Sequence, residues 1–294
     1  MSMPLCVEPD AGLARLTTIG TGGPARFLAR PTTTAELGAV LAWASGDGLP
    51  VAVIGLGSNL LVADEGYDGI ALRLEGELAA IEIDGTTVRA GGGASLAAVV
   101  RRATEAGLAG IEFGCAIPGT VGGAVRMNAG AYGSEIRDVL GTAEVVSAAG
   151  TRRGGPDDLD LSYRHSNVRS SEVVAAAVLR LERGVRDEIR ARVRELQRRR
   201  SESQPRKART FGSVFKNPAE GRGAGALIEA CGLKGHAIGG ARISTVHANF
   251  IENAGDARSA DVAALVTLAR ASVRERFGID LEHEVELLGP IALG

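Results

Sequence analysis

The stretch that most constrains this 294-residue chain is a glycine-rich segment that runs from Gly110 to Gly133. Seven of its 24 residues are glycine, and only Glu112 and Arg126 carry charge. Because glycine loses more backbone entropy on ordering than any other residue, this composition disfavours a regular helix or a central strand. A folded chain keeps such a segment where the backbone must approach something closely. A bound phosphate or flat cofactor meets that requirement, and so does tightly packed protein, so both interpretations stay open here.

Composition limits the kind of protein that this chain can be. Its length predicts about two domains at roughly 150 residues each. Hydrophobic residues make up 45% and charged residues 23%, which is typical of a globular protein with a real core. The net charge of -2 argues against general nucleic-acid binding. The sequence has no long apolar run and no basic N-terminal leader, so we expect no membrane span, no signal peptide and a cytoplasmic location.

The cysteines and histidines do not predict a metal site. The three cysteines are far apart and form no CxxC pair, which favours free thiols in a reducing compartment. The four histidines show no spacing that is typical of metal ligands. These residues are Cys6, Cys115, Cys231, His165, His236, His247 and His283.

The periodicity of apolar residues predicts an α+β chain. Residues 17–28 form a glycine-rich turn and a strand, and residues 32–50 a helix capped by Thr33 or Thr34. The apolar runs within 50–66 are typical of strands in a sheet that is covered on both faces, so we expect a βαβ start. Alternation within residues 70–90, with a turn at Asp84-Gly85, predicts a hairpin.

The later elements follow from the same patterns. Residues 94–110 predict a helix that begins near Ser95, and residues 142–150 and 172–182 predict strands on either side of a polar loop. Residues 184–209 and 257–278 predict two further helices. From Arg186 to Arg209 the first of these carries ten basic and four acidic residues. We interpret this charge as a solvated helix face, and electrostatic attraction of an anionic substrate remains the alternative.

The motif GLGSNLL at residues 55–61 follows an apolar strand. It is not a Rossmann fingerprint, because Leu60 stands where the third glycine is needed and no clear helix follows. A backbone nest for a diphosphate, with Ser58 and Asn59 as hydrogen-bond partners, remains possible on these residues. A plain β-turn fits the same residues.

Three further motifs carry polar groups suited to chemistry. FGSVFKNP places Ser213, Lys216 and Asn217 within five residues, and the alternative is a surface turn. SYRHSN places Arg164 in a polar loop, where it could clamp a carboxylate or form a surface salt bridge. LEHEVELLG alternates apolar and acidic residues like an edge strand, so the pattern alone selects no catalytic glutamate.

Taken in order, the motifs resemble the UDP-N-acetylenolpyruvoylglucosamine reductase family, flavoenzymes of peptidoglycan precursor synthesis. The resemblance runs from residue 17 to residue 289, nearly the whole chain. It is carried by the segments TTIGTGGPA, GLGSNLL, GIEFGCAIPGTVGGAVRMNAGAYG, YRHS, QPRKARTFGSVFKNP, LIEACGLKGHAIGGARISTVHANFIEN and FGIDLEHEVELLG.

The resemblance implies an FAD-binding fold of the vanillyl-alcohol-oxidase/PCMH type. We expect two FAD-binding subdomains, at residues 1–72 and 73–185, and a C-terminal α+β substrate-binding domain at 186–294. It further implies that FAD lies between the 55–59 turn and the 114–133 loop. The residues expected to contact FAD are Gly55, Gly57, Ser58, Asn59, Leu60, Gly114, Cys115, Pro118, Gly119, Thr120, Gly122, Gly123, Ala124, Asn128, Ala129 and Gly130.

The family's reaction implies a role for each matching polar residue. NADPH reduces the flavin and leaves, and flavin N5 then delivers hydride to C3 of the enolpyruvyl group. Ser213 protonates C2, while Arg164 and Glu284 hold the carboxylate and stabilise its developing charge. An ionised glutamate would repel that charge, so Glu284 must be protonated or must orient another donor. Tyr163, Lys216 and Asn217 are the expected substrate-binding residues.

The chain departs from the family pattern at several positions. Gly20 stands where a basic residue is frequent, so no flavin contact is expected from that side chain. Ala116 replaces the glycine that usually precedes Ile-Pro-Gly, which we expect to tighten the loop. No tyrosine follows Tyr163, so the chain resembles the shorter branch that lacks a tyrosine-bearing loop over the substrate.

Two other functions compete with this interpretation. Another FAD-dependent oxidoreductase of the same fold is the first, but an oxidase has no need to protonate a carbanion. A nucleotide-binding regulatory protein without turnover is the second, and the intact catalytic set of Arg164, Ser213 and Glu284 argues against it. We expect a monomer that acts on a small UDP-sugar and binds no nucleic acid.

Overall fold

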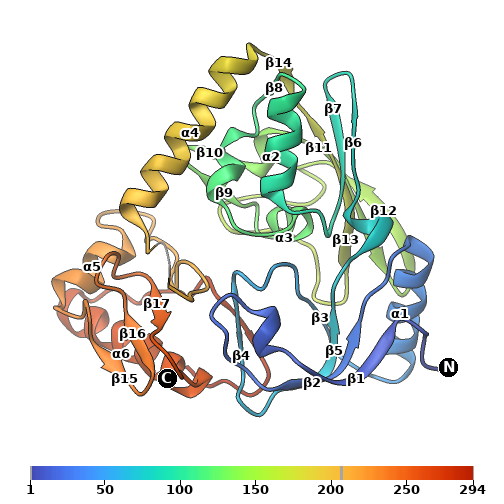
Figure 1. The fold of residues 1–294 in the computed structure, drawn as a ribbon. Coiled ribbons are helices and arrows are strands. Elements are labelled where there is room, and N and C mark those ends of the chain that lie inside the picture. The colour runs from blue at the N-terminus through green and yellow to red at the C-terminus, as the bar shows by residue number, and fades with distance from the viewer. Residues whose placement is uncertain (1, 206–207, 294) are drawn as a thin grey trace. The chain divides into compact units, whose positions relative to one another are not determined.

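The computed structural model describes residues 2–205 and 208–293. The chain forms two compact units, and Figure 1 shows the elements of each. Unit 1 comprises Met1–Pro9, Phe27–Leu56 and Gly69–Arg200. Unit 2 comprises Asp10–Arg26, Gly57–Asp68 and Ser201–Gly294. Each unit is therefore assembled from segments that are distant in the sequence.

An antiparallel five-stranded sheet dominates unit 1. Its strand order is β12-β11-β13-β7-β6. The β6–β7 pair confirms the predicted hairpin, with Gly85 and Thr86 at its turn because Asp84 still pairs with Thr87. The long central strands bury alanine and valine side chains that the apolar patterns predicted. The five strands are β6 (Ile81–Asp84), β7 (Thr87–Gly91), β11 (Leu140–Ser147), β12 (Gly150–Gly154) and β13 (Val173–Arg180).

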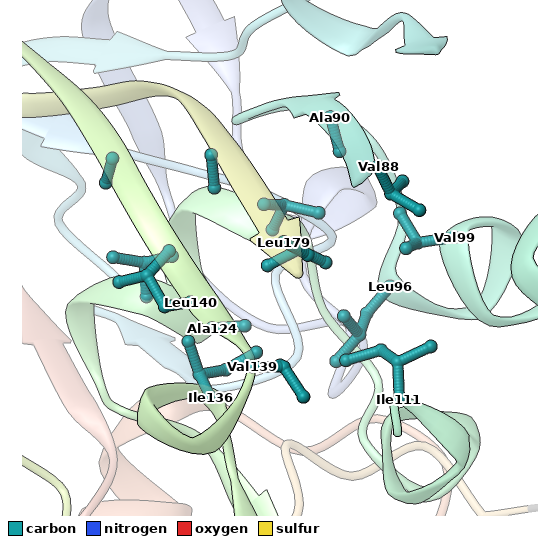
Figure 2. Packing of buried hydrophobic residues seen from close by; sticks show 14 of the residues in the cluster. Val88, Ala90, Leu96, Val99, Ile111, Ala124, Ile136, Val139, Leu140 and Leu179 are labelled. Atoms are coloured by element: carbon teal, nitrogen blue, oxygen red, sulfur yellow. The ribbon is translucent and has the colours of Figure 1, made fainter. Parts of the chain in front are cut away.

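The core of unit 1 lies between this sheet and short helices (Figure 2). Helix α2 (Leu96–Glu105) begins where the Ser95 hydroxyl accepts a hydrogen bond from the Ala98 N–H, as the sequence predicts. Val99 and Leu96 of this helix are fully buried. They pack in one cluster with Val88 of β7. The amphipathic spacing of α2 therefore fixes which face of the helix meets the sheet.

A second sheet has the order β1-β2-β5-β3. Strands β3 and β5 pair in parallel, and helix α1 (Thr34–Gly46) packs its apolar face into a cluster with β5. The Thr33 hydroxyl caps α1 by accepting from the Glu36 N–H, which confirms that end of the predicted helix. These strands are β1 (Val7–Gly12), β2 (Pro24–Ala29), β3 (Val51–Val53) and β5 (Tyr67–Leu72).

The remaining elements of unit 1 are short, apart from one long helix. Helix α4 (Arg186–Ser203) begins in unit 1 and confirms most of the basic helix predicted at residues 184–209. Two residues of that prediction, Arg206 and Lys207, lie outside the described residues. The short strands pair as β8 with β14 and β9 with β10. The short elements are β8 (Leu108–Ala109), β9 (Gly130–Ala131), β10 (Ser134–Glu135), β14 (Glu182–Arg183), α3 (Val121–Arg126) and the 3-10 turns Gly76–Ala79, Glu112–Ala116 and Ile136–Asp138.

Unit 2 packs two helices against small sheets. Helix α6 (Ser259–Phe277) confirms the last predicted helix, and Gly278 ends it in the left-handed conformation, φ +69°. Its face packs in one cluster with helix α5 and the buried rings of Phe211 and Phe215. The other elements are the 3-10 turn Ala14–Leu16, α5 (Ala224–Ala230), β4 (Leu60–Val62), β15 (Ala237–Ile238), β16 (Ala241–Ile243), β17 (Ile251–Asn253) and β18 (Glu286–Leu288).

The pairing of β4 with β18 joins two sequence segments of unit 2, Gly57–Asp68 and Ser201–Gly294. The strands run parallel, with Leu61 opposite Leu287, although more than two hundred residues separate them in the sequence. This contact brings the predicted acidic strand beside the predicted GLGSNLL turn.

Within residues 2–205 and 208–293, no helix combines the length and apolarity needed to cross a membrane.

Candidate active site

The glycine-rich segment fits the packing interpretation at several glycines, of which Gly122 is an example, and leaves Gly123 exposed. A Cβ on Gly122 would lie 3.0 Å from the carbonyl oxygens of both Gly92 and Val174, so packed backbone requires glycine there. Gly123 is exposed, and the nearest atom to its Cβ position is Thr120 Oγ1 at 3.7 Å. The segment therefore combines a packed corner with bare backbone at the surface.

The two segments expected to hold FAD touch each other within unit 1. A Cβ on Gly55 would lie 2.6 Å from Thr120 Oγ1, so only glycine allows this approach. The buried Thr120 also caps α3 through its hydroxyl. Gly123 and Pro118 are exposed and Gly55 is half-buried, and such small residues with accessible main chain fit a flat anionic group. The residues present therefore fit FAD.

Several residues of the expected FAD set instead have protein neighbours. A Cβ on Gly114 would lie 3.0 Å from side-chain atoms of Leu96 and Val100, and Ala124 is buried. The Gly119 carbonyl accepts the Leu96 N–H at 3.0 Å. Ala129 is half-buried against the unit 1 core. Packing accounts for these residue types without a ligand.

Cys115 lies in the 3-10 turn at the start of the segment and is half-buried. Burial raises the pKa of its thiol, and the nearby Arg200 partly opposes that shift. The thiol donates weakly to the Val193 carbonyl, with Sγ and oxygen 3.7 Å apart. These features favour a packed thiol over a reactive thiolate.

The Arg164 side chain extends from a two-residue turn in unit 1. Ser162 and His165 exchange main-chain hydrogen bonds of 3.2 and 3.0 Å, which leaves Tyr163 and Arg164 at the tip. Arg164 Nη2 donates to the Gly130 carbonyl at 3.2 Å. Its guanidinium carbon lies 5.0 Å from the centroid of the exposed Tyr163 ring. The guanidinium is therefore held while part of the turn stays open to solvent.

Ser213 and Glu284 come together in unit 2 on neighbouring extended segments. The Glu284 N–H donates to the Val214 carbonyl at 2.7 Å, and Phe215 forms a bridge with His283. On its other side Ser213 forms a bridge with Phe250. Both Ser213 and Glu284 are half-buried. The structure thus pairs the backbone segments that carry the predicted proton donor and the predicted carboxylate-binding glutamate.

The GLGSNLL turn borders the same segments of unit 2. Asn59 Nδ2 donates to the Glu284 carbonyl at 3.0 Å, and the Glu286 N–H donates to the Asn59 carbonyl at 3.0 Å. Gly57 has φ +64°, and a Cβ there would lie 1.9 Å from the Leu16 carbonyl oxygen. The turn therefore requires glycine for its conformation and for close packing. The two hydrogen bonds of Asn59 place the Ser58–Asn59 part of the turn next to the Glu284 segment.

Lys216 and Asn217 follow Ser213 and have partners within unit 2. Lys216 Nζ lies 2.5 Å from Glu282 Oε1. The Asn217 side-chain oxygen accepts the Ala224 N–H at 3.0 Å, at the start of α5. Lys216 is half-buried, whereas Asn217 and Glu282 are exposed. A substrate group reaching Lys216 would compete with this ion pair.

Asn249 supports the Ser213 segment, and sequence reasoning missed it. This side chain is 3% exposed, accepts the Phe215 N–H at 3.0 Å and donates to the Phe215 carbonyl at 2.8 Å. The Asn249 carbonyl also accepts the Val214 N–H. An amide can pair with both groups of one residue because it carries a donor and an acceptor. No local pattern signals this role, since Asn249 lies 34 residues from Phe215.

Gly20 occupies the position where the family frequently has a basic side chain. A Cβ there would lie 3.4 Å from Cδ and Nη1 of Arg209, within unit 2. The side chain of Arg209 therefore fills the space beside Gly20.

No group of three or more His, Cys, Asp or Glu residues suited to a metal ion occurs in the described part of the chain.

The chain is similar to known proteins over almost its full length. Residues 25–153 match a family described as an FAD binding domain, and residues 204–288 match the C-terminal domain of UDP-N-acetylenolpyruvoylglucosamine reductase. A reductase of that name from Paramagnetospirillum magneticum is 46% identical over 281 residues, covering 95% of this chain and 91% of the relative. Another, from Symbiobacterium thermophilum, is 44% identical and covers 94% of this chain and 90% of the relative.

A solved structure agrees with these sequence matches. The crystal structure of the Thermus caldophilus UDP-N-acetylenolpyruvylglucosamine reductase aligns with a TM-score of 0.84 at 38% identity, covering 96% of this chain and 99% of the other. The expected FAD-binding fold followed by a C-terminal α+β domain is confirmed. With this identity, coverage and fold, the chain belongs to the UDP-N-acetylenolpyruvoylglucosamine reductase family.

Proposed function

We propose that the chain reduces the enolpyruvyl group of UDP-N-acetylglucosamine-enolpyruvate to the lactyl ether of UDP-N-acetylmuramate, with Arg164, Ser213 and Glu284 as its catalytic residues. The observation that supports the assignment is the main-chain pairing of the segments that carry Ser213 and Glu284, the two residues to which we assign the proton donor and the carboxylate-binding group. Family membership makes the chain an FAD-dependent oxidoreductase of peptidoglycan synthesis that uses NADPH.

The FAD would be held by exposed main chain and small side chains of the two expected segments. Gly123 is exposed and Gly55 is half-buried, so their main chain suits this contact, and the polar side chains of Ser58 and Asn59 are further candidates. Bound and reduced, the FAD supplies a hydride to C3 of the enolpyruvyl group.

The chain's own residues complete the reaction at the substrate. Negative charge gathers on the carboxylate end as C3 accepts hydride, and the Arg164 guanidinium stabilises that charge more than the ground state. The Ser213 hydroxyl delivers a proton to C2. Lys216 and Asn217 bind the anionic nucleotide or carboxylate end, and Tyr163 covers part of the substrate. The basic face of α4 adds a favourable potential for a substrate that carries a diphosphate.

The organisation that we propose keeps two FAD-binding subdomains, residues 1–72 and 73–185, and a substrate-binding domain, residues 186–294. The chain works as a cytoplasmic monomer that acts on a UDP-sugar and binds no nucleic acid. Support comes from the net charge of -2, which does not suit nucleic acid.

An anaerobic absorbance titration tests the function as a whole. We expect the flavin bands of the purified protein to bleach with NADPH and to return on addition of the enolpyruvyl UDP-sugar. Bands that bleach and stay bleached would contradict the substrate assignment and would favour another FAD-dependent oxidoreductase of the same fold. A protein that cannot be reconstituted with FAD would contradict the enzyme assignment.

Glu284→Gln tests whether this residue acts as a neutral hydrogen-bond donor. The amide keeps the shape and a donor, so we expect substrate reduction to slow by about tenfold or less, the scale of one neutral hydrogen bond. Glu284→Ala removes the donor and should slow the reaction further. Stopped-flow reoxidation of the reduced flavin by substrate measures both rates. If Glu284→Gln is as slow as Glu284→Ala, the carboxyl group itself is required, and the donor role is wrong.

A further inference from the structure

The turn that carries Arg164 adopts a backbone conformation that needs outside support. Arg164 has φ +55°, in the left-handed region that a non-glycine residue enters at a cost in energy. Such a conformation persists only where the surrounding structure over-determines it. The exchange of hydrogen bonds between Ser162 and His165 closes the turn but does not fix it to the rest of unit 1.

The side chain of Asn128 makes one such attachment, at the first residue of the turn. Its Nδ2 donates to the Ser162 carbonyl at 3.0 Å, and its Oδ1 accepts the Arg137 N–H at 2.9 Å. Asn128 is 0% exposed and has φ +39°, which asparagine tolerates better than most residues. Because its amide is fully enclosed and already bonded on both sides, the structure offers the flavin no route to this side chain.

Two further contacts join the same segments. The Arg137 Nη1 atom donates to the Leu161 carbonyl at 2.8 Å, just before the turn. Arg164 Nη2 donates to the Gly130 carbonyl, two residues beyond Asn128. The segment that begins at Asn128 therefore contacts both the backbone of the turn and the guanidinium that the turn presents.

We propose that Asn128 is a positioning residue that sets the Arg164 guanidinium for the substrate carboxylate, rather than a flavin contact. This inference rests on the role proposed above for Arg164. The buried amide fixes the Ser162 carbonyl, the turn follows that anchor, and the Gly130 carbonyl completes the alignment of the guanidinium. Small displacements of such a group cost much of its effect on the transition state.

Asn128→Asp removes the donor to Ser162 and keeps size, acceptor and tolerance of positive φ. We expect FAD content and flavin reduction by NADPH to stay unchanged, while reoxidation by the enolpyruvyl UDP-sugar slows about 10- to 100-fold. Asn167→Asp is the matched control, because Asn167 Nδ2 donates to the Asp158 carbonyl at 2.9 Å in the same polar loop, and this exposed residue should tolerate the change. Equal rates for the two variants would overturn the proposal.

A double-mutant cycle separates positioning from a general structural effect. If Asn128 acts through Arg164, then Asn128→Asp should slow an Arg164→Ala enzyme by no more than about twofold. A full additional loss in that background would overturn the proposal. If Asn128→Asp does not yield folded holoenzyme, Asn128→Gly takes its place in the cycle, because glycine accepts the backbone conformation without the amide.

Hydrogen exchange of the holoenzyme tests the attachment without turnover. We expect amides of residues 162–165 to exchange at least about tenfold faster in Asn128→Asp, since the turn loses its anchor. Unchanged exchange there would overturn the proposal. Faster exchange together with a normal rate for Arg164→Ala would instead contradict the role of Arg164 in the proposed function, while the anchoring by Asn128 would stand.

Discussion

Ser213→Ala is expected to retain FAD and to accept electrons from NADPH at the normal rate, yet to reduce the enolpyruvyl UDP-sugar about 10²- to 10⁴-fold more slowly, the range for loss of a general acid. The loss should fall on reoxidation of the flavin, because only that half of the reaction needs a proton at C2. Stopped-flow measurement of the two half-reactions separates them. Solvent isotope effects on the second half should shrink as the proton transfer from Ser213 disappears.

The fold should survive this substitution. Ser213 is held through main-chain bridging to Phe250, and its neighbours Val214 and Phe215 are held by Asn249 and by the Glu284 segment. Alanine leaves all of these main-chain bonds intact. Ser272→Ala in α6 is a matched control, since it makes the same change at a half-buried position of unit 2. Normal substrate reduction by Ser213→Ala would show that another group delivers the proton.

Elements with local signals could be predicted from the sequence. Thr33 and Ser95 mark the first turns of α1 and α2 because a hydroxyl accepting the first free N–H groups is a local interaction. The β6–β7 hairpin depends on two turn residues, and α6 depends on its own periodicity. None of these requires knowledge of what lies elsewhere in the chain.

Contacts between distant segments could not be predicted in this way. The bond from Asn59 to the Glu284 carbonyl spans 225 residues, and the parallel pairing of β4 with β18 joins segments equally distant in the sequence. Pattern alone made residues 281–289 an acidic edge strand and did not distinguish Glu284 from Glu282 and Glu286. In the structure Glu284 is half-buried, whereas the other two are exposed. The resemblance to a family, rather than any periodicity, selected it.

Buried amides show the same limit within the candidate site. Asn128 lies in a motif that is expected to contact FAD. In the structure its side chain is buried, and its amide nitrogen and oxygen both form hydrogen bonds with main-chain groups of the protein. Asn249 lies in a segment that carries the family resemblance but was given no role there, yet its side chain bonds both main-chain groups of Phe215, two residues after Ser213. Motifs record which residues a site needs, and only tertiary structure separates those that touch a ligand from those that position others.

Arg164→Lys is the second substitution with a large expected effect. Lysine keeps the positive charge but loses the planar fork that pairs with a carboxylate through two parallel hydrogen bonds. We expect reoxidation by substrate to slow about 10²-fold or more, the scale for removing a donor that stabilises developing negative charge. Because this interaction is stronger in the transition state, kcat should fall more than KM rises. Flavin reduction by NADPH should be unchanged.

Arg169→Lys is the control for this substitution, since Arg169 is an exposed arginine of the same polar loop. The position of Arg164 also separates a chemical loss from a structural one. Arg164 has φ +55°. This backbone conformation is equally strained for arginine and for lysine, and glycine adopts it without that strain. Arg164→Gly should therefore unfold at a temperature no lower than that of Arg164→Lys, although it lacks any cation. If a stable Arg164→Gly enzyme reduced substrate as fast as the parent, charge stabilisation at the carboxylate would have to come from a different residue.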